Sequence, residues 1–373
     1  MIKKVLKAIL NKLPGGNYIV FESLPLLADN TRAVFDEMLR RGMQRKYRFC
    51  WIVKEKTGDL PQFPNTEYIC TKGFWNELRY NWVTLRAKCI VCCNVFVPAR
   101  LPRTKSVYLT HGTTVKKLNG YVLPEGIHYT LVAGEGLRQL MAQELCGDSD
   151  TFYALGYPRN DVLTQPDCDL HKYLEGDFDK VIVWYPTFRQ HQNGIQSKAG
   201  NALPILHDPE KAQRLNEVAR ANRVLVVIKP HFAQDLRYIQ ACELSNIRFI
   251  DDAFFTKNGI SSYAFVGSCD ALISDYSSIY FDYLLCDKPQ AVVWEDLEDY
   301  RQAPGIAIDL DHYMMGAEKV YTPEQLEQFV IDVAQGVDRL QSQRAQICGE
   351  VNYARDGKNA ARVTDFIVEN CGL

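Results

Sequence analysis

The sequence has no long hydrophobic run and almost no excess of charge of one sign. Its longest apolar stretch, Cys89–Ala99, is far shorter than the ~20 residues that a membrane-spanning helix requires, so we expect a soluble or peripheral protein. The 43 basic and 45 acidic side chains give a formal net charge of −2 at pH 7, so no global basic field indicates a nucleic-acid partner. Repeats and low-complexity tracts are also missing, which argues against repeat and disordered proteins.

The composition that remains is typical of a large folded protein. Hydrophobic residues make up 47% and charged residues 24% of the 373 positions, and a chain of this length predicts two domains. The 12 cysteines are scattered and follow no signal peptide, which favours reduced thiols in a cytosolic protein. Cys89 and Cys92 would point to opposite faces of a strand, so we expect core residues rather than a metal or redox pair.

The first 13 residues, MIKKVLKAILNKL, have apolar side chains at helical spacing, with lysines mostly between them and no acidic residue. Two structures fit this pattern. One is an interfacial helix that binds anionic lipid, and the other is a first helix packed on the protein with its lysines in water. The following Pro14-Gly15-Gly16 offers no convincing cleavage site, so a signal peptide is not expected.

Strand and helix patterns alternate along the rest of the chain, which predicts parallel sheets covered by helices on both faces. Helical patterns are found, for example, at Thr31–Arg41, Phe74–Arg86 and Leu137–Leu145. Apolar runs typical of buried strands form a first series at Tyr18–Phe21, Phe49–Val53, Cys89–Val97, Val107–Thr110 and Tyr129–Ala133, and a second series at Val181–Trp184, Val224–Ile228, Ile247–Ile250, Ala271–Ile273 and Ala291–Trp294.

The two series meet near Thr164–Asp169, a short polar stretch. We therefore predict two doubly wound, Rossmann-like α/β domains that face a central cleft, an N-terminal domain at residues 1–165 and a C-terminal domain at residues 166–373. The helical pattern of Gly357–Glu369 could pack back on either domain. In sheets of this kind, ligands bind beyond the carboxyl ends of the strands.

The first polar cluster at such a strand end is residues 110–118, directly after the strand Val107–Leu109. Gly112 allows close approach of the backbone, and Thr113 or Thr114 is suited to cap a helix whose N-terminus attracts anions. His111 carries an imidazole, which ionises near neutral pH and therefore suits proton transfer. The alternative is a histidine whose hydrogen bond is satisfied by a loop carbonyl.

A second cluster, Gly156–Asp161, closes the first series. Its glycine and proline fix a turn, from which Arg159, Asn160 and Asp161 would project polar groups toward the domain junction. The alternative is a hinge turn with an Asx cap.

Cationic side chains follow two strands of the second series. Arg189 comes soon after Val181–Trp184, and Lys229 and His231 come directly after Val224–Ile228. Arginine and lysine beside a ligand crevice suit phosphate. Taken singly, such cations more commonly cap helices or pair with surface carboxylates.

A further strand, Ala271–Ile273, leads into the start of an amphipathic helix that carries Asp275, Ser277 and Ser278. The serine hydroxyls and the free backbone N–H groups would form an anion site for a diphosphate. The alternative is an ordinary N-cap, which is compatible with such a site.

In this order, the clusters resemble the CDP-glycerol glycerophosphotransferase family, the teichoic-acid primases and polymerases of bacterial wall synthesis and their capsule-synthesis relatives. The resemblance covers nearly the whole chain. The segments that carry it are Val20–Ser23 with Asp29-Asn30, His111–Thr113, Lys116–Leu118, Gly156–Asp161, Pro186–Arg189, Asp275–Ser278, Asp287–Pro289, Asp299–Arg301 and Asp356–Lys358.

The resemblance implies a GT-B-like fold and the transfer of glycerol phosphate from CDP-glycerol to a hydroxyl of a saccharide acceptor, usually lipid-linked, with release of CMP. His111 would deprotonate the acceptor hydroxyl, and preorganised donors would stabilise charge on the phosphoryl oxygens. The expected set is catalytic His111 and His231, donor-binding Arg189, Lys229, Asp275, Ser277 and Ser278, and acceptor-side Gly112, Thr113, Arg159, Asn160 and Asp161.

The expected cofactors and partners follow from the same resemblance. We identify no Asp-x-Asp motif of the kind usual in metal-dependent glycosyltransferases, so no metal and no obligate cofactor is expected. The expected partners are a CDP-polyol donor, a lipid-linked or capsular saccharide acceptor and, through residues 1–13, the inner face of the bacterial cell membrane. Nucleic acid is not among them, and a peripheral cytoplasmic location is expected.

The sequence departs from the family pattern at three places. Thr114 stands where a proline usually follows His-Gly-Thr, Asn119 replaces a usual glycine, and Met314–Gly316 occupies the region where Pro-Gly-Pro is usual. These departures concern the acceptor more than the donor chemistry. The chain has about the length of a bare catalytic unit, which favours a primase-type enzyme over a polymerase, and CDP-ribitol is an alternative donor.

Two other functions fit the sequence less specifically. A GT-B glycosyltransferase that uses a nucleotide sugar would share the fold but release UDP from a UDP-sugar. A non-catalytic nucleotide- or saccharide-binding protein would tolerate the loss of His111 without losing ligand affinity.

Overall fold

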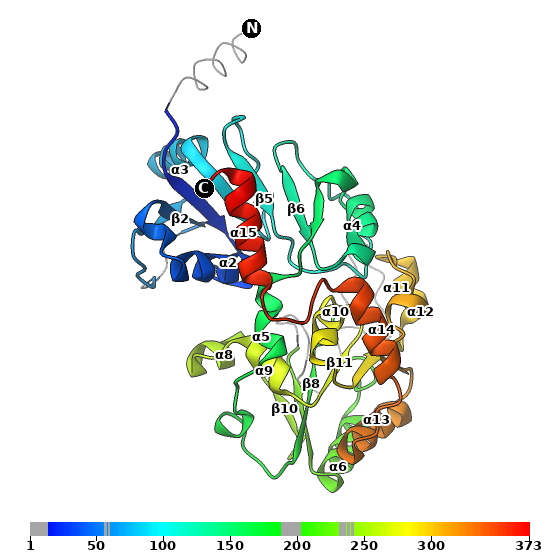
Figure 1. Ribbon diagram of the computed structural model, residues 1–373. Coiled ribbons are helices and arrows are strands. Elements are labelled where there is room, and N and C mark those ends of the chain that lie inside the picture. The colour runs from blue at the N-terminus through cyan, green and yellow to red at the C-terminus, as the bar shows by residue number, and fades with distance from the viewer. Residues whose placement is uncertain are drawn as a thin grey trace. The chain divides into compact units, whose positions relative to one another are not determined.

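The computed structural model describes residues 14–55, 58, 60–187, 203–230, 236, 239 and 242–373. It divides the chain into two compact units, each built on one parallel sheet (Figure 1). The first unit comprises the described residues up to 113, together with 120–161 and 358–373, and the second comprises 114–119 and 162–357. The predicted α/β class with two doubly wound domains is confirmed.

The first unit contains a seven-stranded sheet in the order β3-β2-β1-β4-β5-β6-β7, in which every pair is parallel. Along the chain, β2 and β3 are added on one side of β1, and β4 to β7 are added on its other side. Because the crossovers are right-handed, this reversal places helices on both faces of the sheet. The strands are β1 (Tyr18–Glu22), β2 (Arg48–Val53), β3 (Thr66–Cys70), β4 (Ala87–Cys92), β5 (Lys105–Tyr108), β6 (Tyr129–Val132) and β7 (Phe152–Ala154).

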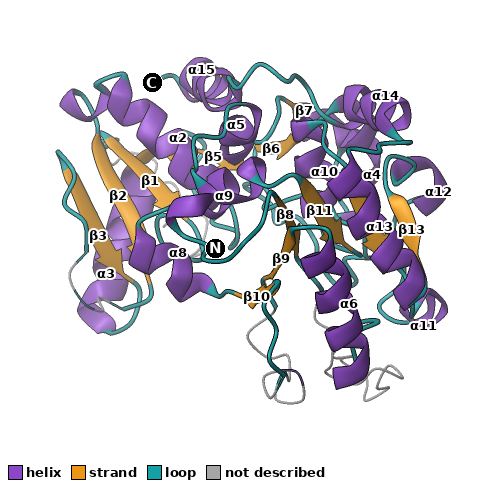
Figure 2. Cartoon of the chain, turned by 90° about the horizontal axis from the view of Figure 1, so that it is seen from below, coloured by secondary structure: helices purple, strands orange, loops and turns teal. Residues whose placement is uncertain are grey.

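Helices cover both faces of this sheet, with α2 and α3 on opposite sides (Figure 2). Phe35 of α2 packs against three aromatic side chains of the strands, Phe21, Phe49 and Trp51. All four are fully buried, and the centroid of the Phe35 ring lies 5.3–5.6 Å from those of the other three. The helices are α2 (Asp29–Arg40), α3 (Phe74–Arg86), α4 (Arg138–Glu144), the boundary helix α5 (Asp161–Thr164) and α15 (Asn359–Cys371), with short 3₁₀ turns at Met43–Arg45, Glu135–Leu137, Ser149–Thr151 and Pro158–Asn160.

The second unit contains a six-stranded parallel sheet in the order β10-β9-β8-β11-β12-β13. Its central strands are buried on both faces and therefore read as continuous apolar runs, such as VLVVI in β9. The strands are β8 (Lys180–Trp184), β9 (Val224–Ile228), β10 (Ile247–Phe249), β11 (Ala271–Ser274), β12 (Gln290–Val293) and β13 (Glu318–Val320).

Two long helices of this unit, α6 and α13, lie side by side against one face of the sheet (Figure 2). Their apolar stripes join β8, β9 and β12 in one buried core. The helices are α6 (Pro209–Ala221), α8 (Asp252–Asn258), α9 (Ser262–Ser268), α10 (Ile279–Tyr283), α11 (Leu297–Gln302), α12 (Leu310–Tyr313), α13 (Pro323–Gln335) and α14 (Gln341–Val351), with 3₁₀ turns at Leu170–Lys172 and Leu284–Cys286.

The single domain boundary predicted at residue 165 needs correction at two places. The C-terminal helix α15 packs beside α2 in the first unit rather than in the second (Figure 1), and the Phe366 ring lies edge-to-face with Tyr129 and tilted against Tyr153. Residues 114–119 instead belong to the second unit, where Lys116 forms a β-bridge with Ile306. Both are long-range pairings, which local sequence patterns do not encode.

Strand predictions differ from the structure in length and number. The predicted strand Cys89–Val97 ends at Cys92 because the chain turns there and the next three N–H groups bind the carboxylate of Glu22. The short strands β3, β7 and β13 were not predicted, since only one residue of each is buried.

We predict that Gly156→Ala detaches α15 from the first unit. Gly156 has φ of +81°, and a Cβ there would lie 2.2 Å from Oδ1 of the buried Asn359, the first residue of α15. Gly336 has φ of +70° with no atom within 4 Å, so Gly336→Ala is a control for backbone strain alone. Gly156→Ala should cost about 1–3 kcal/mol more than the control in urea unfolding and increase hydrogen exchange in α15. Equal losses would contradict the close contact.

Candidate active site

The described candidate residues lie just beyond the carboxyl ends of parallel strands, as predicted. His111 follows β5 in the first unit, whereas Lys229 follows β9 and Asp275 follows β11 in the second unit. Arg189 and His231 lie outside the described residues, and so does the N-terminal segment 1–13. The two groups of residues are therefore described separately, one for each unit.

The loop that carries His111 is held by the side chain of Asn30. This amide is fully buried at the start of α2, and its Nδ2 donates hydrogen bonds to the carbonyls of Leu109 at 3.3 Å and Thr110 at 2.9 Å. Thr110 adopts φ of +49°, an uncommon backbone conformation for a residue with a Cβ. The amide hydrogen bonds therefore stabilise a strained backbone immediately before His111.

An ion pair adds a second support for the same loop. Arg159 Nη1 lies 2.7 Å from Oδ1 of Asp29 and donates to the carbonyl of His111 at 2.8 Å. The side chains of Arg159 and Asp29 are only 9% and 16% exposed, so solvent screens this pair less than an ordinary surface pair. The His111 side chain itself is exposed. The loop is thus fixed through its backbone, which leaves the imidazole at the surface.

The next two residues of the loop differ in their surroundings. Gly112 has φ of +137°, a backbone conformation that favours glycine. Thr113 is fully buried, and its hydroxyl lies 3.4 Å from the hydroxyl of Tyr157. The predicted acceptor-side role of Gly112 and Thr113 stays a prediction.

The turn Gly156–Asp161 holds parts of the first unit together. The Asp161 carboxylate accepts the backbone N–H groups of Asn359 at 2.7 Å and Ala360 at 2.8 Å, so it caps the N-terminus of α15. Asn160 is fully buried in the same turn. These contacts support the structural alternative for Asn160 and Asp161, and Arg159 positions the His111 loop; a direct role of the three in acceptor binding stays a prediction.

Glu22 lies in a segment that carries the family resemblance, but sequence reasoning assigned no role to it. It is 5% exposed at the end of β1, and its Oε2 accepts the N–H groups of Cys93, Asn94 and Val95 at 3.0–3.1 Å. Burial raises the pKa of the Glu22 carboxyl, an effect that the three hydrogen bonds partly offset. Glu22 thus satisfies the buried backbone of the turn after β4.

In the second unit, Asp275 joins two strand ends. Its carboxylate is fully buried and accepts hydrogen bonds from the N–H of Thr187 at 2.8 Å and from the Thr187 hydroxyl. It also accepts the N–H of Tyr276 at 2.6 Å. Asp275 therefore ties the loop after β8 to the loop after β11, and its predicted role in donor binding stays a prediction.

The two serines of this loop are arranged differently from Asp275. Ser277 and Ser278 are half-buried at the start of α10, and Ser278 is the N-cap residue without a side-chain capping bond. Neither hydroxyl forms a hydrogen bond with a residue in the described part of the chain. Both hydroxyls are therefore in a position to donate to a ligand oxygen.

Sequence reasoning assigned no role to Tyr276, which fixes the serine loop from the other side. Its ring stacks on Tyr300 with centroids 3.6 Å apart and an interplanar angle of 13°, and both rings are 3% exposed. Its hydroxyl lies 3.1 Å from Oδ1 of Asp296, at the start of α11. The loop after β11 is thus held by contacts from the loops after β8 and β12.

Lys229 follows β9 with a side chain that is 19% exposed. Its Nζ lies 3.0 Å from Oδ1 of Asp252, a residue that is 88% exposed, and 5.7 Å from the centroid of the Tyr185 ring. An ion pair with one fully solvated partner contributes little to stability. Lys229 is therefore placed to exchange Asp252 for an anionic ligand.

The chain contains Asp-x-Asp triplets at residues 148–150, 167–169, 177–179 and 309–311. Asp148, Asp169 and Asp309 cap short helical turns, whereas Asp177 and Asp179 both pair with Arg223. Within the described residues, no three His, Cys, Asp or Glu side chains are grouped closely enough to hold a metal ion. In the same part of the chain, no helix is both long and apolar enough to cross a membrane.

We predict that Asn30→Ala loosens the His111 loop. The variant removes the amide donor from the carbonyls of Leu109 and Thr110 and leaves Thr110 with the weaker Cys93 thiol donor, and a buried carbonyl that loses its partner costs about 1–3 kcal/mol. Hydrogen exchange at residues 110–113 should therefore rise. Asn246→Ala is the control, because Asn246 is 6% exposed and its Nδ2 donates to the carbonyl of Val224 at 3.0 Å in the second unit. An unchanged exchange rate at residues 110–113 in Asn30→Ala would contradict the clamp.

Comparison with known proteins identifies the family. The chain is 24% identical over 332 residues to the teichoic acid poly(glycerol phosphate) polymerase of Bacillus spizizenii, covering 80% of this chain and 79% of the relative. It is 23% identical over 327 residues to the teichoic acid ribitol-phosphate polymerase of Staphylococcus aureus, covering 79% and 54%. A structure of the wall teichoic acid polymerase TagF superposes with a TM-score of 0.74 at 19% identity, covering 100% of this chain and 96% of TagF, which confirms the GT-B-like fold class.

The family model described as CDP-glycerol:poly(glycerophosphate) glycerophosphotransferase matches residues 6–369, nearly the whole chain. Because the match includes both units and every loop described above, it does not rest on one motif. The chain belongs to the CDP-glycerol:poly(glycerophosphate) glycerophosphotransferase family.

Proposed function

We propose that this protein transfers glycerol phosphate from CDP-glycerol to a hydroxyl of a saccharide acceptor and releases CMP, in the synthesis of a teichoic-acid-like wall or capsule polymer. The observation that carries this proposal is the family match over residues 6–369, together with the position of the matching motifs after the carboxyl ends of β5, β8 and β11. A solved TagF structure that superposes with a TM-score of 0.74 was soaked with CDPG, which supports a donor of this class.

The proposed reaction forms one P–O bond and breaks another. The acceptor hydroxyl loses its proton to His111 and attacks the β-phosphorus of the donor, and the bond to the CMP oxygen breaks. The Ser277 and Ser278 hydroxyls donate hydrogen bonds to the phosphoryl oxygens, where negative charge accumulates. Arg189 and His231 are proposed to assist there on the strength of the family resemblance alone, and no metal is included in the scheme.

The proposal has two further parts, the identity of the donor and the number of polyol phosphate units that are added. CDP-glycerol is the donor we favour, and CDP-ribitol is the second candidate, since one of the relatives is a ribitol-phosphate polymerase. For the number of units added we favour a primase-type enzyme; the chain is 24% identical over 245 residues to the teichoic acid glycerol-phosphate primase of Bacillus spizizenii and covers 57% of it.

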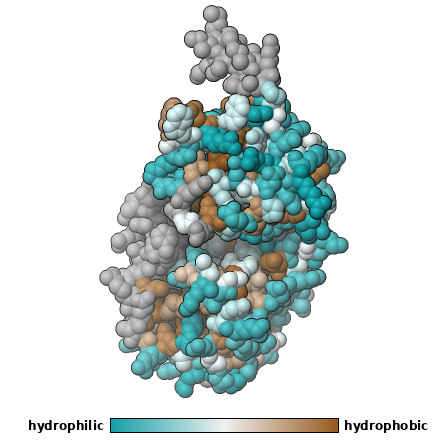
Figure 3. All heavy atoms as spheres, turned by 90° about the vertical axis from the view of Figure 1, so that its left-hand side faces the viewer, coloured by the Kyte–Doolittle hydropathy of each residue, from teal (hydrophilic) through white to brown (hydrophobic). Residues whose placement is uncertain are grey.

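An exposed face of α3 supports the proposed peripheral position at the membrane. Phe74, Trp75, Leu78 and Trp82 are 67%, 79%, 48% and 43% exposed, and at 100° per residue they lie on one side of the helix. The opposite side carries the buried Val83. Hydrophobic side chains reach the protein surface on the face in Figure 3, the side on which α3 lies in Figure 1.

Cationic groups accompany this aromatic face. The Arg86 guanidinium lies 4.8 Å from the centroid of the Trp82 ring, and its Nε donates to the carbonyl of Pro14 at 3.0 Å. The sequence that leads into Pro14 contains four lysines and no acidic residue. Tryptophan beside arginine is the composition favoured at the boundary between anionic headgroups and acyl chains.

We predict that a substitution in the first unit impairs catalysis and that a substitution in the second unit impairs donor binding. His111→Ala should bind CDP-glycerol as the parent does but turn over about 10²–10⁴ times more slowly, because the base contacts the acceptor. Ser277→Ala/Ser278→Ala should bind CDP-glycerol more weakly, by roughly 1.5–3 kcal/mol for each hydrogen bond to a charged group. Calorimetric affinity and the rate of CMP release measure both effects.

The control for this comparison is His312→Ala, which removes a partly exposed histidine that pairs with Glu350 at 2.9 Å. It should keep parental turnover even if its melting temperature falls. Parental turnover in His111→Ala, or parental donor affinity in the double serine variant, would overturn the role assigned to the corresponding residue.

A separate prediction concerns membrane binding by the exposed face of α3. Trp75→Ala/Leu78→Ala should weaken sedimentation with phosphatidylglycerol-rich vesicles at least about tenfold, because each buried apolar side chain contributes roughly 1.5–3 kcal/mol. Val122→Ala/Tyr121→Ala is the control, since these side chains are 60% and 57% exposed on another segment. If both double variants sediment like the parent, α3 does not bind the bilayer.

A further inference from the structure

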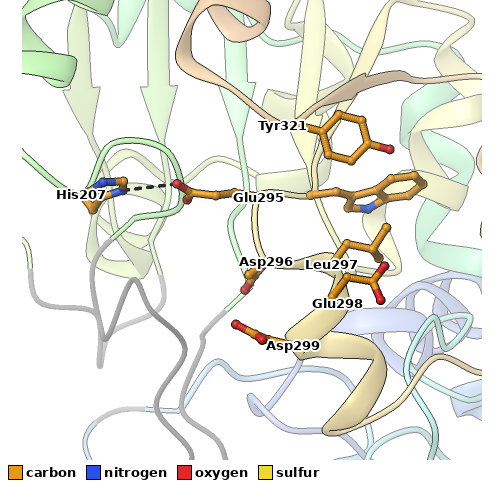
Figure 4. Close-up of a pocket in the computed structure, with 8 residues that line it drawn as sticks. His207, Glu295, Asp296, Leu297, Glu298, Asp299 and Tyr321 are labelled. Carbon is orange, nitrogen blue, oxygen red and sulfur yellow. Dashed lines mark ion pairs between the residues drawn. The ribbon is translucent and has the colours of Figure 1, made fainter.

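A cavity of about 540 Å³ lies beside the carboxyl ends of β12 and β13 in the second unit (Figure 4). Most of its lining comes from residues 294–299, which lead from β12 into α11, and the rest comes from Tyr321 after β13 and from His207 before α6. A volume of this size suits a small organic group. Neither the family match nor the reaction proposed above assigns a ligand to this cavity.

The cavity is directly connected to the loop that carries Ser277 and Ser278. Asp296 lines the cavity, and its Oδ1 accepts the hydrogen bond from the hydroxyl of Tyr276, the residue that precedes Ser277. Tyr300, one residue beyond the lining residue Asp299, stacks on the same Tyr276 ring. A ligand held by the two serines would therefore have this cavity as a neighbour within the same unit.

The charges of the described lining are unfavourable for a phosphate. Of the eight described lining residues, four are carboxylates and none is lysine or arginine. Two described cations that contact lining residues are engaged, since Lys211 Nζ lies 2.7 Å from Nε2 of His207 and Arg301 Nη1 lies 2.8 Å from Glu298. An anion placed here would be repelled by several negative charges, whereas a hydroxyl can donate to them.

Individual carboxylates differ in how much of their hydrogen-bonding capacity is used. Glu295 accepts the N–H of Ile205 at 2.6 Å and lies 3.5 Å from Nδ1 of His207. Asp299 is half-buried and forms no side-chain hydrogen bond or ion pair with a described residue. Figure 4 shows its carboxylate beside that of Asp296, with the Tyr321 ring on the opposite side of the cavity.

The aromatic lining supplies a second and independent indication of a ligand. Trp294 is 2% exposed, and its indole N–H has no acceptor in the described structure. A buried N–H group without an acceptor is unfavourable. Because Trp294 lines the cavity, an oxygen atom of a bound ligand could accept the hydrogen bond from its indole N–H. Trp294 and Tyr321 also offer apolar ring surface to carbon-bound hydrogens.

We propose that this cavity binds the hydroxyl-bearing polyol of the donor, with Asp299 as its principal hydrogen-bond acceptor. The assignment rests on the proposed function, because it requires a donor whose diphosphate is held by Ser277 and Ser278. The serine loop would then bind the charged part of the donor, and the acidic and aromatic cavity would bind its uncharged end. A bound metal ion does not fit, since no three of these carboxylates converge on one point in the described structure.

The test compares donors with and without a polyol. In calorimetric titrations, Asp299→Asn should weaken binding of CDP-glycerol by about tenfold, the size expected for one hydrogen bond to a charged group. Tyr321→Ala should weaken it through the loss of the ring contact, and both variants should leave the affinity for CDP unchanged. The matched control is Asp311→Asn, which removes an exposed carboxylate of the same unit outside the cavity and should change neither affinity. Because Asp299 and Tyr321 are partly exposed, folding should be retained, and melting temperatures check this.

The possible outcomes separate this assignment from the proposed function. Equal effects on CDP-glycerol and CDP, or no effect on either, would overturn the polyol site while leaving the transferase proposal intact. If only CDP-ribitol responds, the site still binds a polyol, and the preferred donor is the longer one. If the parent protein binds no CDP-polyol at all, the proposed function and the polyol site are both wrong.

Discussion

Buried polar side chains that hydrogen-bond to the backbone of neighbouring loops are the interaction on which both candidate sites depend. A parallel sheet leaves its carboxyl edge as a set of loops whose backbone groups have no strand partner. Asn30 satisfies the carbonyls before His111, and Asp275 satisfies the N–H groups that link the loops after β8 and β11. In each unit, one fully buried residue therefore fixes the loop that carries the proposed chemistry.

This arrangement separates the residues that position the loops from those that would contact substrate. Asp275, Tyr276 and Arg159 have their polar groups engaged within the protein, whereas His111 is exposed and the two serine hydroxyls have no partner in the described residues. Donors that are already oriented need no reorganisation when charge develops on a phosphoryl group, which is the main means by which such sites stabilise a transition state. The supporting residues thus explain why the family motifs extend beyond the groups that react.

The sequence allowed prediction of features that depend on local pattern. The alternation of apolar runs predicted two parallel sheets. It also predicted that His111 and the two serines follow the carboxyl ends of strands, as they do in the structure. Three features needed long-range contacts that no local pattern encodes: the packing of α15 beside α2, the capping of α15 by Asp161, and the pairing of Arg159 with Asp29. The stacking of Tyr276 on Tyr300 also joins residues from separate loops, although the nearby acidic and aromatic residues 294–300 could have indicated a polar site at that strand end.

The measurement that most directly tests the account is the identity of the nucleotide released. The protein would be incubated with CDP-glycerol or CDP-ribitol and a panel of lipid-linked and soluble saccharide primers, with UDP-sugars as the competing donors, and nucleotides and product masses would be determined together. The account predicts CMP from a CDP-polyol and a product heavier by one or a few polyol phosphate units, because the bond to the CMP oxygen breaks. Release of UDP from a UDP-sugar, with no CMP from either CDP-polyol, would contradict it and identify a glycosyltransferase instead.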